Sequence, residues 1–497
     1  MLSILVFLPL AAAAGLLAVP RASDRMVRWS WVAVSAVEVV LVAAVWLHFR
    51  RHPPANGGFA FEVRRRWIPT LGSGYHIGVD GLSLPLVALT TVLFLACAVY
   101  SLRQTRRVRL FAALFLFLES VCLGVFVSLD LVLFFVFFDL SIVGMYFVIN
   151  GWGHAQARRA ALQFFLYTFI GSLALLVGFI VLYLAADPHT FDMVELIKAN
   201  PLAGNTARGA VALAAIFAGL AIKTPTVPFH TWLPPAHTEA PAAGSAILAG
   251  VLLKLGTYGF VRIAMPMLPQ SWRRYAVAIL VVGLVSVLYG ALVALAQNNF
   301  KRMIAYTSVN HMGYIVLALG AAGLVADNSE QARTLAITGA VTQMVSHGLI
   351  TGALFLLAGV LYERRHTYDM DSFGGLAGPA PVFAAVTAAA MFASLGLPGF
   401  SGFIAEFQIF TGSLGPAPVF TALAFPGILI TAALLLRAYQ RMFLGTPRGE
   451  GFADLTVPEA ISTIPLMVGA LVIGIFPRFL LDVIEPASRA LGVLVER

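Results

Sequence analysis

Long apolar stretches recur along the whole chain and alternate with short polar segments. Stretches of about 18 residues or more are long enough to cross the roughly 30 Å hydrocarbon core of a bilayer as α-helices. Alternation of apolar and polar residues is too weak to favour the ten-residue strands of an outer-membrane barrel. We therefore predict an all-α polytopic membrane protein with about fourteen spans, at residues 2–19, 28–48, 80–102, 110–128, 130–150, 161–185, 209–240, 243–265, 275–297, 301–323, 333–361, 380–412, 418–443 and 459–478.

Two of these spans are interrupted by proline and glycine. In the span at 209–240, four prolines follow Lys223 within the segment KTPTVPFHTWLPPAH. In the span at 380–412, the segment LGLPGFSG places Pro398 among three glycines, shortly before Glu406. Proline removes a backbone donor and breaks a helix. A pair of such spans indicates a transporter with an internal repeat and an ion site near the middle of the membrane.

The interrupted spans are the seventh and the twelfth, so their positions differ by five helices. A second copy displaced by an odd number of helices must be inverted relative to the membrane. We predict two inverted five-helix repeats, each with one discontinuous helix. The predicted units are 1–105 with helices 1–3, 106–266 with helices 4–8 and a break near 223–235, 267–447 with helices 9–13 and a break near 396–402, and 448–497 with helix 14 and a tail.

The charge distribution predicts the orientation. Of all residues 60% are hydrophobic and 11% charged, and the net charge of +9 comes from basic residues in short loops, which argues against nucleic-acid binding. Most of these loops follow odd-numbered spans, including the one with Lys301 and Arg302; the segment with Arg64, Arg65 and Arg66 is the exception. The positive-inside rule places the odd loops in the cytoplasm and both termini outside. The first apolar segment lacks a preceding basic stretch, so we expect a first span rather than a cleaved signal.

Ionisable side chains inside the predicted spans are few, and they are the candidate proton carriers: Glu119, Asp139, Lys223, Lys254, His311, His347 and Glu406. A charge at the bilayer centre costs about 2.5–3.5 kcal/mol on insertion scales, so such residues usually face a bundle interior or a wet cavity. Burial disfavours the charged form and a nearby opposite charge favours it, so separating Asp139 from Lys223 would release a proton. Histidines titrate near neutrality and suit a relay.

Each candidate also has a structural interpretation. The two lysines could extend to the headgroups, and Asp139 could cap a helix or make an interhelical bond. His311 and His347 could be polar contacts between helices, and structural pairing of Glu119 is at least as plausible as function. Three residues around the first break could line a channel or could bond freed backbone groups: His230, His237 and Glu239.

Redox, nucleotide and metal chemistry leave no signature in the sequence. Cys97 and Cys122 lie far apart inside apolar spans without a CxxC pair, so neither a disulfide framework nor an iron–sulfur or zinc site is expected. Dinucleotide and phosphate-binding glycine motifs are not found. We expect no catalytic, cofactor-binding or metal-ligating residues in this chain, and the driving reaction would then lie elsewhere.

The segment KTPTVPFHTWLPPAHTEAPAAGSAILAGVLLKLGTYGFVRI at 223–263 resembles the hallmark stretch of the antiporter-like membrane subunits of respiratory complex I, the proton-pumping NADH:quinone oxidoreductase. The M-type chain, subunit 4 in mitochondria, is the best match. Further matching segments are YHIGVDGLSLPLVALT at 75–90, DLVLFFVFFDLSIVGMYFVI at 130–149, FKRMIAYTSVNHMGY at 300–314, HTYDMDSFGGLAG at 366–378 and PGFSGFIAEF at 398–407, so the resemblance covers nearly the whole chain.

The resemblance implies a role for each candidate. Lys223 would be the lysine of the broken helix and Lys254 the central lysine that joins two half-channels. His311 and His347 would form the relay, and Glu406 would be the acid on the exit side. The family's partner of the broken-helix lysine is a glutamate on the fifth helix, whereas this chain has the shorter Asp139, which puts pumping through this site in question. The segment WLPPAH also has Pro235 where an acid is expected.

The resemblance further implies fourteen helices and an assembly. NADH, FMN, iron–sulfur clusters and quinone would bind to partner subunits, similar antiporter-like chains would lie on either side, and lipids would surround a chain in the bacterial cytoplasmic membrane. A long lateral C-terminal helix, found in the L-type relative, is not expected. Alternatives are a subunit of a multisubunit cation/proton antiporter, a subunit of a ferredoxin-linked or hydrogenase-type complex, and a scaffolding subunit that no longer pumps.

Overall fold

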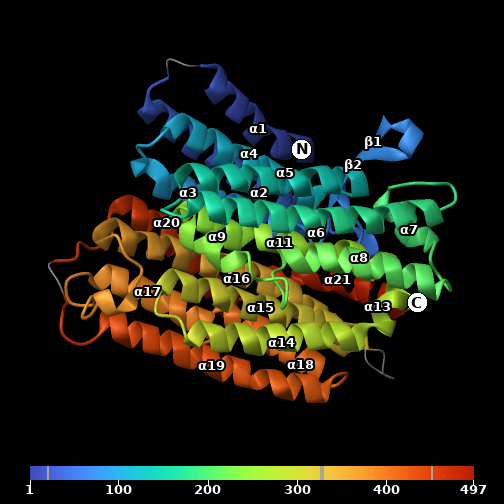
Figure 1. Ribbon diagram of the computed structural model, residues 1–497. Helices are drawn as coiled ribbons and strands as arrows, with labels where there is room; N and C mark the ends of the chain where they lie inside the picture. The colour runs from blue at the N-terminus through green and yellow to red at the C-terminus, as the bar shows by residue number, and fades with distance from the viewer. Residues whose placement is uncertain (20–21, 325–329, 449–450, 497) are drawn as a thin grey trace.

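The computed structural model describes residues 1–19, 22–324, 330–448 and 451–496, which form a bundle of long helices lying side by side (Figure 1). In the first half these are α1 (Leu2–Ala18), α2 (Asp24–Arg51), α3 (Leu84–Tyr100), α4 (Val108–Val127), α5 (Leu131–Trp152), α6 (Ala157–Ala185), α8 (Thr206–Lys223) and α9 (Leu233–Glu239). The second half has α14 (Ala276–Leu295), α15 (Phe300–Ala322), α16 (Glu330–Arg365), α17 (Pro381–Ser394), α18 (Ser401–Leu414), α19 (Pro418–Phe443) and α20 (Val457–Ile475).

The segment between these two sets, 242–267, is one continuous helical span with two wider π turns. It comprises α10 (Ala242–Ile247), η4 (Leu248–Leu252), α11 (Leu253–Gly259), η5 (Phe260–Ala264) and α12 (Met265–Met267). Every predicted span therefore coincides with a helix, a broken helix or this composite. Among the described residues, 11 helices are long and apolar enough to cross a membrane by length and composition. The prediction of a helical membrane protein is confirmed, and the count of fourteen spans is compatible with these helices.

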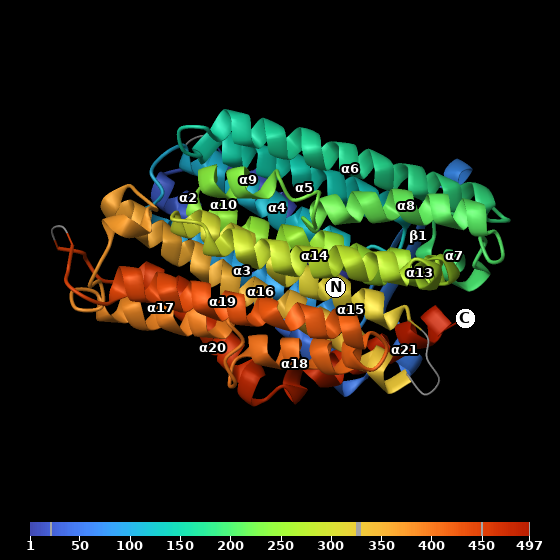
Figure 2. The ribbon, with the colours of Figure 1, turned by 60° about the horizontal axis from the view of Figure 1, so that its bottom comes forward.

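Both predicted breaks are present. The first separates α8 from α9 at residues 224–232, and the second separates α17 from α18 at residues 395–400. Exposed polar backbone is costly inside a membrane, and at the first break the Val227 N–H donates to Ser286 Oγ (2.9 Å) while the Trp232 indole donates to the Ile222 carbonyl (3.0 Å). In two views the α8–α9 pair and the α17–α18 pair run in opposite directions (Figures 1 and 2).

A β-hairpin and several short or peripheral helices depart from the predicted pattern of spans and loops. Strands β1 (Ala60–Ile68) and β2 (Ser73–Val79) pair antiparallel, with Val63 opposite Ile77 and Arg65 opposite Tyr75. The short helices are α7 (Met193–Ala199) and α13 (Pro269–Arg274), together with the one-turn segments η1 (Ala55–Gly57), η2 (Pro69–Leu71), η3 (Ser101–Arg103) and η6 (Met370–Ser372). The predicted tail contains a 19-residue helix, α21 (Arg478–Glu496), which packs along α16.

Both chain ends lie on the same face as the hairpin. The Tyr75 hydroxyl donates to Ser3 Oγ (2.9 Å), and Arg273 donates to the carbonyl of Glu496 (2.6 Å). We call this the even face, because the loops after even-numbered spans lie here, and the opposite one the odd face. Placement of both termini on one face agrees with the predicted topology.

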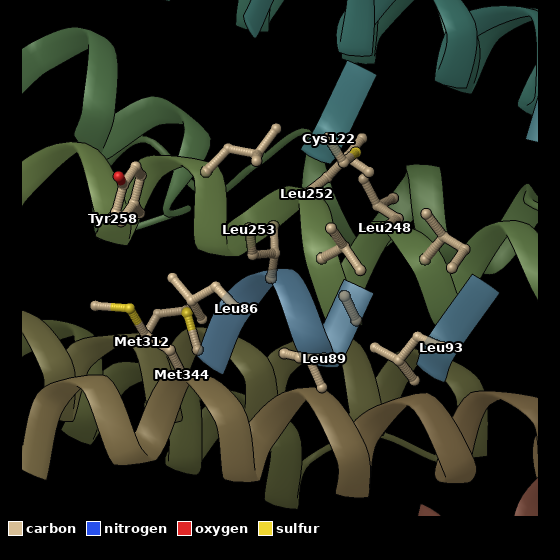
Figure 3. Close-up of a cluster of buried hydrophobic side chains, with 14 of the residues drawn as sticks. Leu86, Leu89, Leu93, Cys122, Leu248, Leu252, Leu253, Tyr258, Met312 and Met344 are labelled. Carbon is tan, nitrogen blue, oxygen red and sulfur yellow. The ribbon is translucent and has the colours of Figure 1, made fainter. Parts of the chain in front are cut away.

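The core between the two halves is apolar. Figure 3 shows Leu86, Leu89 and Leu93 of α3 packed against Leu252 and Leu253 of the composite span, with methionines of α15 and α16 close by. These side chains surround the segment that carries Lys254, so the ionisable groups described below lie in an environment that excludes bulk water.

Candidate proton path

Lys254 lies at the centre of the bundle and is fully buried. It belongs to α11, between the two π turns η4 and η5, a geometry that is often found at functional sites. Its Nζ donates to the carbonyl of Ala249 (2.6 Å) and lies 2.6 Å from Nδ1 of His347 on α16. A charged lysine donates across this contact, and a neutral lysine accepts from a protonated imidazole, so the contact persists in either protonation state.

The path continues from His347 to the second broken helix. The rings of His347 and His311 of α15 are 5.4 Å apart between centroids. His311 Nε2 lies 3.2 Å from the carbonyl of Ser394, the last residue of α17, and 3.9 Å from Oε1 of Glu406 on α18. Ser394 is part of a helix end, where carbonyls lack helical partners and accept from side chains. Lys254, His347, His311 and Glu406 therefore form one contiguous line of buried titratable groups.

The second break shapes the end of this line. Gly396 has φ +80°, and a Cβ there would lie only 2.4 Å from Oε2 of Glu406, so the glycine is what lets the carboxylate approach the broken backbone. A small polar cavity adjoins the carboxylate and is lined by His311, Gln343, Ser346, His347, Ile350, Thr351, Ala393, Ser394, Gly402 and Glu406. Its polar lining provides donors and acceptors between the histidines and the acid.

Lys223 and Asp139 lie close together at the first break, but their contact differs from the predicted pair. Lys223 ends α8, is 1% exposed, and donates from Nζ to Ser141 Oγ (3.0 Å) rather than to Asp139, which precedes Ser141 by two residues on α5. The ammonium lies 5.0 Å from the centroid of the Phe138 ring. The two charges interact electrostatically, while Oδ1 of Asp139 is buried with no hydrogen-bond partner in the described part of the chain.

Glu119 lies in a second acidic group, away from the main line. Its Oε2 accepts from Ser35 Oγ of α2 (2.9 Å), and its charge acts on Glu38, also of α2. Glu38 is 0% exposed, and both of its carboxylate oxygens lack a partner among the described residues. Glu38 was not among the residues predicted from the sequence, although an acid ten residues into the span at 28–48 is a signal of the same kind as Glu119.

The three residues proposed to line a channel near the first break have different environments. His237 of α9 is 0% exposed and stacks on Phe355 (centroids 4.4 Å apart), and neither ring nitrogen has a described partner. His230 packs edge-on against Tyr289 (4.9 Å). Glu239, half-buried at the odd face, accepts from the backbone N–H of Gln156 (2.8 Å). His237 therefore belongs with the buried titratable groups, and Glu239 with the rim of the odd face.

Lys301 is a further buried lysine, although its sequence position predicted a place in a cytoplasmic loop. It is the second residue of α15 and is 0% exposed, whereas its neighbour Arg302 is exposed. A lysine at the start of an apolar span gives the same sequence pattern whether it points into the loop or into the bundle, so no sequence signal distinguished the two cases.

Proton transfer is the chemistry that this set of groups supports. Lysine, histidine and glutamate side chains, buried and in sequence, can pass a proton by small movements. Among the described residues, no group of three or more His, Cys, Asp or Glu side chains is placed to hold a metal ion.

Two discontinuous helices around a line of buried ionisable groups define the class of antiporter-like membrane subunits. Residues 128–431 match the family described as NADH:quinone oxidoreductase/Mrp antiporter, TM. The chain belongs to this family, which confirms the resemblance drawn from its motifs.

Individual relatives and solved structures agree with this assignment. The chain is 39% identical to NADH-quinone oxidoreductase subunit M of Rhodobacter capsulatus, covering 98% of this chain and 95% of the relative. It is 38% identical to NAD(P)H-quinone oxidoreductase chain 4 1 of Synechococcus elongatus, covering 99% and 91%. A chain of respiratory complex I from Thermus thermophilus superposes with a TM-score of 0.89 at 29% identity, covering 100% of both chains. The Mrp complex from Dietzia shares the fold, with a TM-score of 0.86 at 22% identity, covering 100% and 97%.

Proposed function

We propose that this chain moves protons across the membrane as the M-type subunit of an NADH:quinone oxidoreductase, complex I. The observation that carries the proposal is the buried line Lys254, His347, His311 and Glu406, whose neighbours are separated by 2.6 Å, 5.4 Å and 3.9 Å between the atoms or ring centres given above. Isolated charges in a membrane are costly and are retained where ions move. Four such groups in a line would not stabilise a bundle that had only a structural role.

In the proposed path, Asp139 and Lys223 form the element that changes state. Lys223 loses its proton when Asp139 moves away, and Lys254 passes protons onward through His347 and His311 to Glu406. Glu119 and His230 contribute polar lining at the sides, and His237 and Glu239 contribute on the odd face. The units 106–266 and 267–447 supply one half-channel each, which the opposite directions of their broken helices support.

The chain is an integral membrane protein, as its family and apolar helices require. We place it in a bacterial cytoplasmic membrane, with the odd face in the cytoplasm and both termini outside. The basic residues of the odd loops support this orientation, while the arginines of strand β1 on the even face oppose it.

The partners are the other membrane-arm subunits, including similar antiporter-like chains on either side, and membrane lipids. The names of the relatives, NADH-quinone oxidoreductase subunit M, support this assembly. NADH, FMN, iron–sulfur clusters and quinone are then bound by partner subunits, and the redox reaction in those subunits drives the movements around Lys223 and Lys254.

The alternative of a redox-independent cation/proton antiporter rests on the fold shared with the Mrp complex. The membrane-bound sulfane sulfur reductase also shares it, with a TM-score of 0.87 at 20% identity. Identities of 22% and 20% are well below the 39% shared with subunit M over nearly the whole chain, which favours the complex I assignment.

Replacement of the central lysine tests the proposal. Lys254→Met keeps the length of the side chain but removes the proton site, so we expect proton pumping in inverted membrane vesicles to fall roughly tenfold or more with the complex still assembled. Lys198→Met, at an exposed position of α7, is the control. Full pumping by an assembled Lys254→Met complex would overturn the proposal.

A further inference from the structure

We propose that Lys301 is the proton-uptake residue of the odd face and that it feeds Lys254 through His237. This inference rests on the proposed function and adds the link between the central lysine and the surface. Glu239 would supply the proton from the rim. Each of these groups is placed by a contact, its burial or an electrostatic interaction in the structure.

Lys301 is held inside the bundle by specific partners. Its Nζ donates to the carbonyl of Ala240 (2.5 Å) and to the hydroxyl of Tyr368 (3.3 Å), and it lies 4.9 Å from the centroid of the Tyr368 ring. Ala240 directly follows α9, whose C-terminal end attracts a cation. The ammonium is therefore anchored to the second half of the broken helix and has not turned back toward the loop.

His237 lies on α9, three residues before Ala240, and its ring interacts electrostatically with two lysines. The charges of Lys301 and Lys254 both act on its ring, which places it within electrostatic reach of each. Both ring nitrogens are buried and have no hydrogen-bond partner among the described residues. A buried imidazole without a hydrogen-bond partner, within electrostatic range of two buried amines, is costly as a packing element, but it suits a group that accepts and donates a proton.

Lys301 also has a connection toward the odd face. Glu239 lies close enough to Lys301 for the two charges to interact. Glu239 is half-buried, and its carboxylate accepts from the exposed backbone N–H of Gln156. His154 Nε2 lies 3.2 Å from the same Tyr368 hydroxyl that Lys301 contacts. An acid at the rim whose charge reaches a buried lysine is the arrangement expected for proton uptake from water.

The transfer balances without further reactants. The Lys301 ammonium gives a proton from Nζ to a free ring nitrogen of His237, directly or through water, and becomes a neutral amine. That amine still has N–H groups for the Ala240 carbonyl and a lone pair for the Tyr368 hydroxyl. His237 passes a proton from its ring to a neutral Lys254, and Lys301 regains one from solvent by way of Glu239.

Lys301→Arg separates this role from a structural one. Arginine keeps the charge and the donors toward Ala240 and Tyr368, but it does not release its proton in proteins. We expect a severalfold loss of proton pumping in inverted vesicles with the complex assembled and with a changed dependence of the rate on the pH of the medium, which bathes the odd face. Arg302→Lys, at the adjacent exposed position, should leave rate and pH profile unchanged.

His237→Gln provides a second, independent variant if arginine does not fit at position 301. Glutamine keeps polar atoms near the ring position but cannot carry the proton, so the same loss is expected. Wild-type rates and pH profiles in both variants would overturn the inference. If Lys254→Met abolishes pumping while these variants pump normally, the uptake route alone is wrong; if Lys254→Met also pumps normally, the proposed function itself is wrong.

Discussion

Nζ of Lys254 lies 2.6 Å from Nδ1 of His347, and this contact joins the two predicted repeats. Lys254 belongs to the predicted unit 106–266 and His347 to the predicted unit 267–447, so on the proposed path the proton would pass from one unit to the other at this contact. His347 Nε2, on the far side of the ring, is buried and has no partner within the described residues. The ring thus has one nitrogen toward the lysine and one available toward His311.

The first prediction concerns His347. His347→Gln retains an acceptor toward Lys254 but cannot be protonated, so we expect pumping to fall roughly tenfold or more while assembly is retained. Proton pumping in inverted membrane vesicles, normalised to the assembled complex, measures this. His52→Gln, at an exposed position, is the matched control. Normal pumping by His347→Gln would mean that the histidine is only a polar contact between helices.

The second prediction concerns Asp139. Its side chain is one methylene shorter than the glutamate that the resemblance to the antiporter-like subunits implies at this position. Lys223 donates to Ser141, so the present carboxylate interacts with the lysine only at longer range. Asp139→Asn removes this interaction and should lower pumping severalfold, whereas Asp139→Glu extends the carboxylate and should retain or increase it. The scaffolding interpretation predicts normal pumping by Lys223→Ala, so loss of pumping in that variant would exclude it; normal pumping by both Asp139→Asn and Lys223→Ala would exclude a role for this pair.

The architecture was predictable because span length and helix breaks are local properties of the sequence. The lengths of the apolar segments predicted the helices. The prolines after Lys223 and the glycines around Pro398 predicted the two breaks. The hairpin at 60–79 was missed because strand β1, with three consecutive arginines at 64–66, lacks the alternation of apolar and polar residues that predicts a strand. The helix α21 was missed because a span is recognised by a uniformly apolar segment, whereas α21 places residues such as Leu480 and Leu491 on one buried face only.

The site was only partly predictable. Lys254, His347, His311 and Glu406 were found because each interrupts an apolar span, and the structure brings them together. The hydrogen-bond partner of Lys223 was not predicted. Whether the lysine bonds Asp139 or Ser141 depends on the rotation of α5 and on the length of the acidic side chain, which is one methylene shorter in aspartate than in glutamate. The burial of Lys301 was not predicted, because it depends on the position of the end of α9. The sequence of α15 carries no information about that position.

The hairpin and α7 are joined by a charged cluster outside the membrane spans. His76 is buried, with Nδ1 2.7 Å from Asp192 and Nε2 2.8 Å from Glu62, and Arg64 contacts Asp192 (3.2 Å) and Glu195. Burial alone would lower the pKa of His76, but the hydrogen bonds and charges of Asp192 and Glu62 outweigh burial and raise this pKa above its ordinary value of 6.5. Burial alone would raise the pKa of Asp192, but the hydrogen bonds from His76 and from the Glu195 backbone N–H, with the charges of His76 and Arg64, lower it.

The third prediction is that attachment of the hairpin to α7 depends on pH. Because folding raises the pKa of His76, its stabilising contribution is complete below the ordinary pKa and is lost as pH rises through the raised value. Trypsin should therefore cleave after Arg65 and Arg66 severalfold faster at about pH 9 than at about pH 6, beyond the change in trypsin's own activity. His76→Gln, which cannot be protonated, should show only the change in trypsin's activity. An equal pH dependence in both proteins would mean that His76 does not control this attachment.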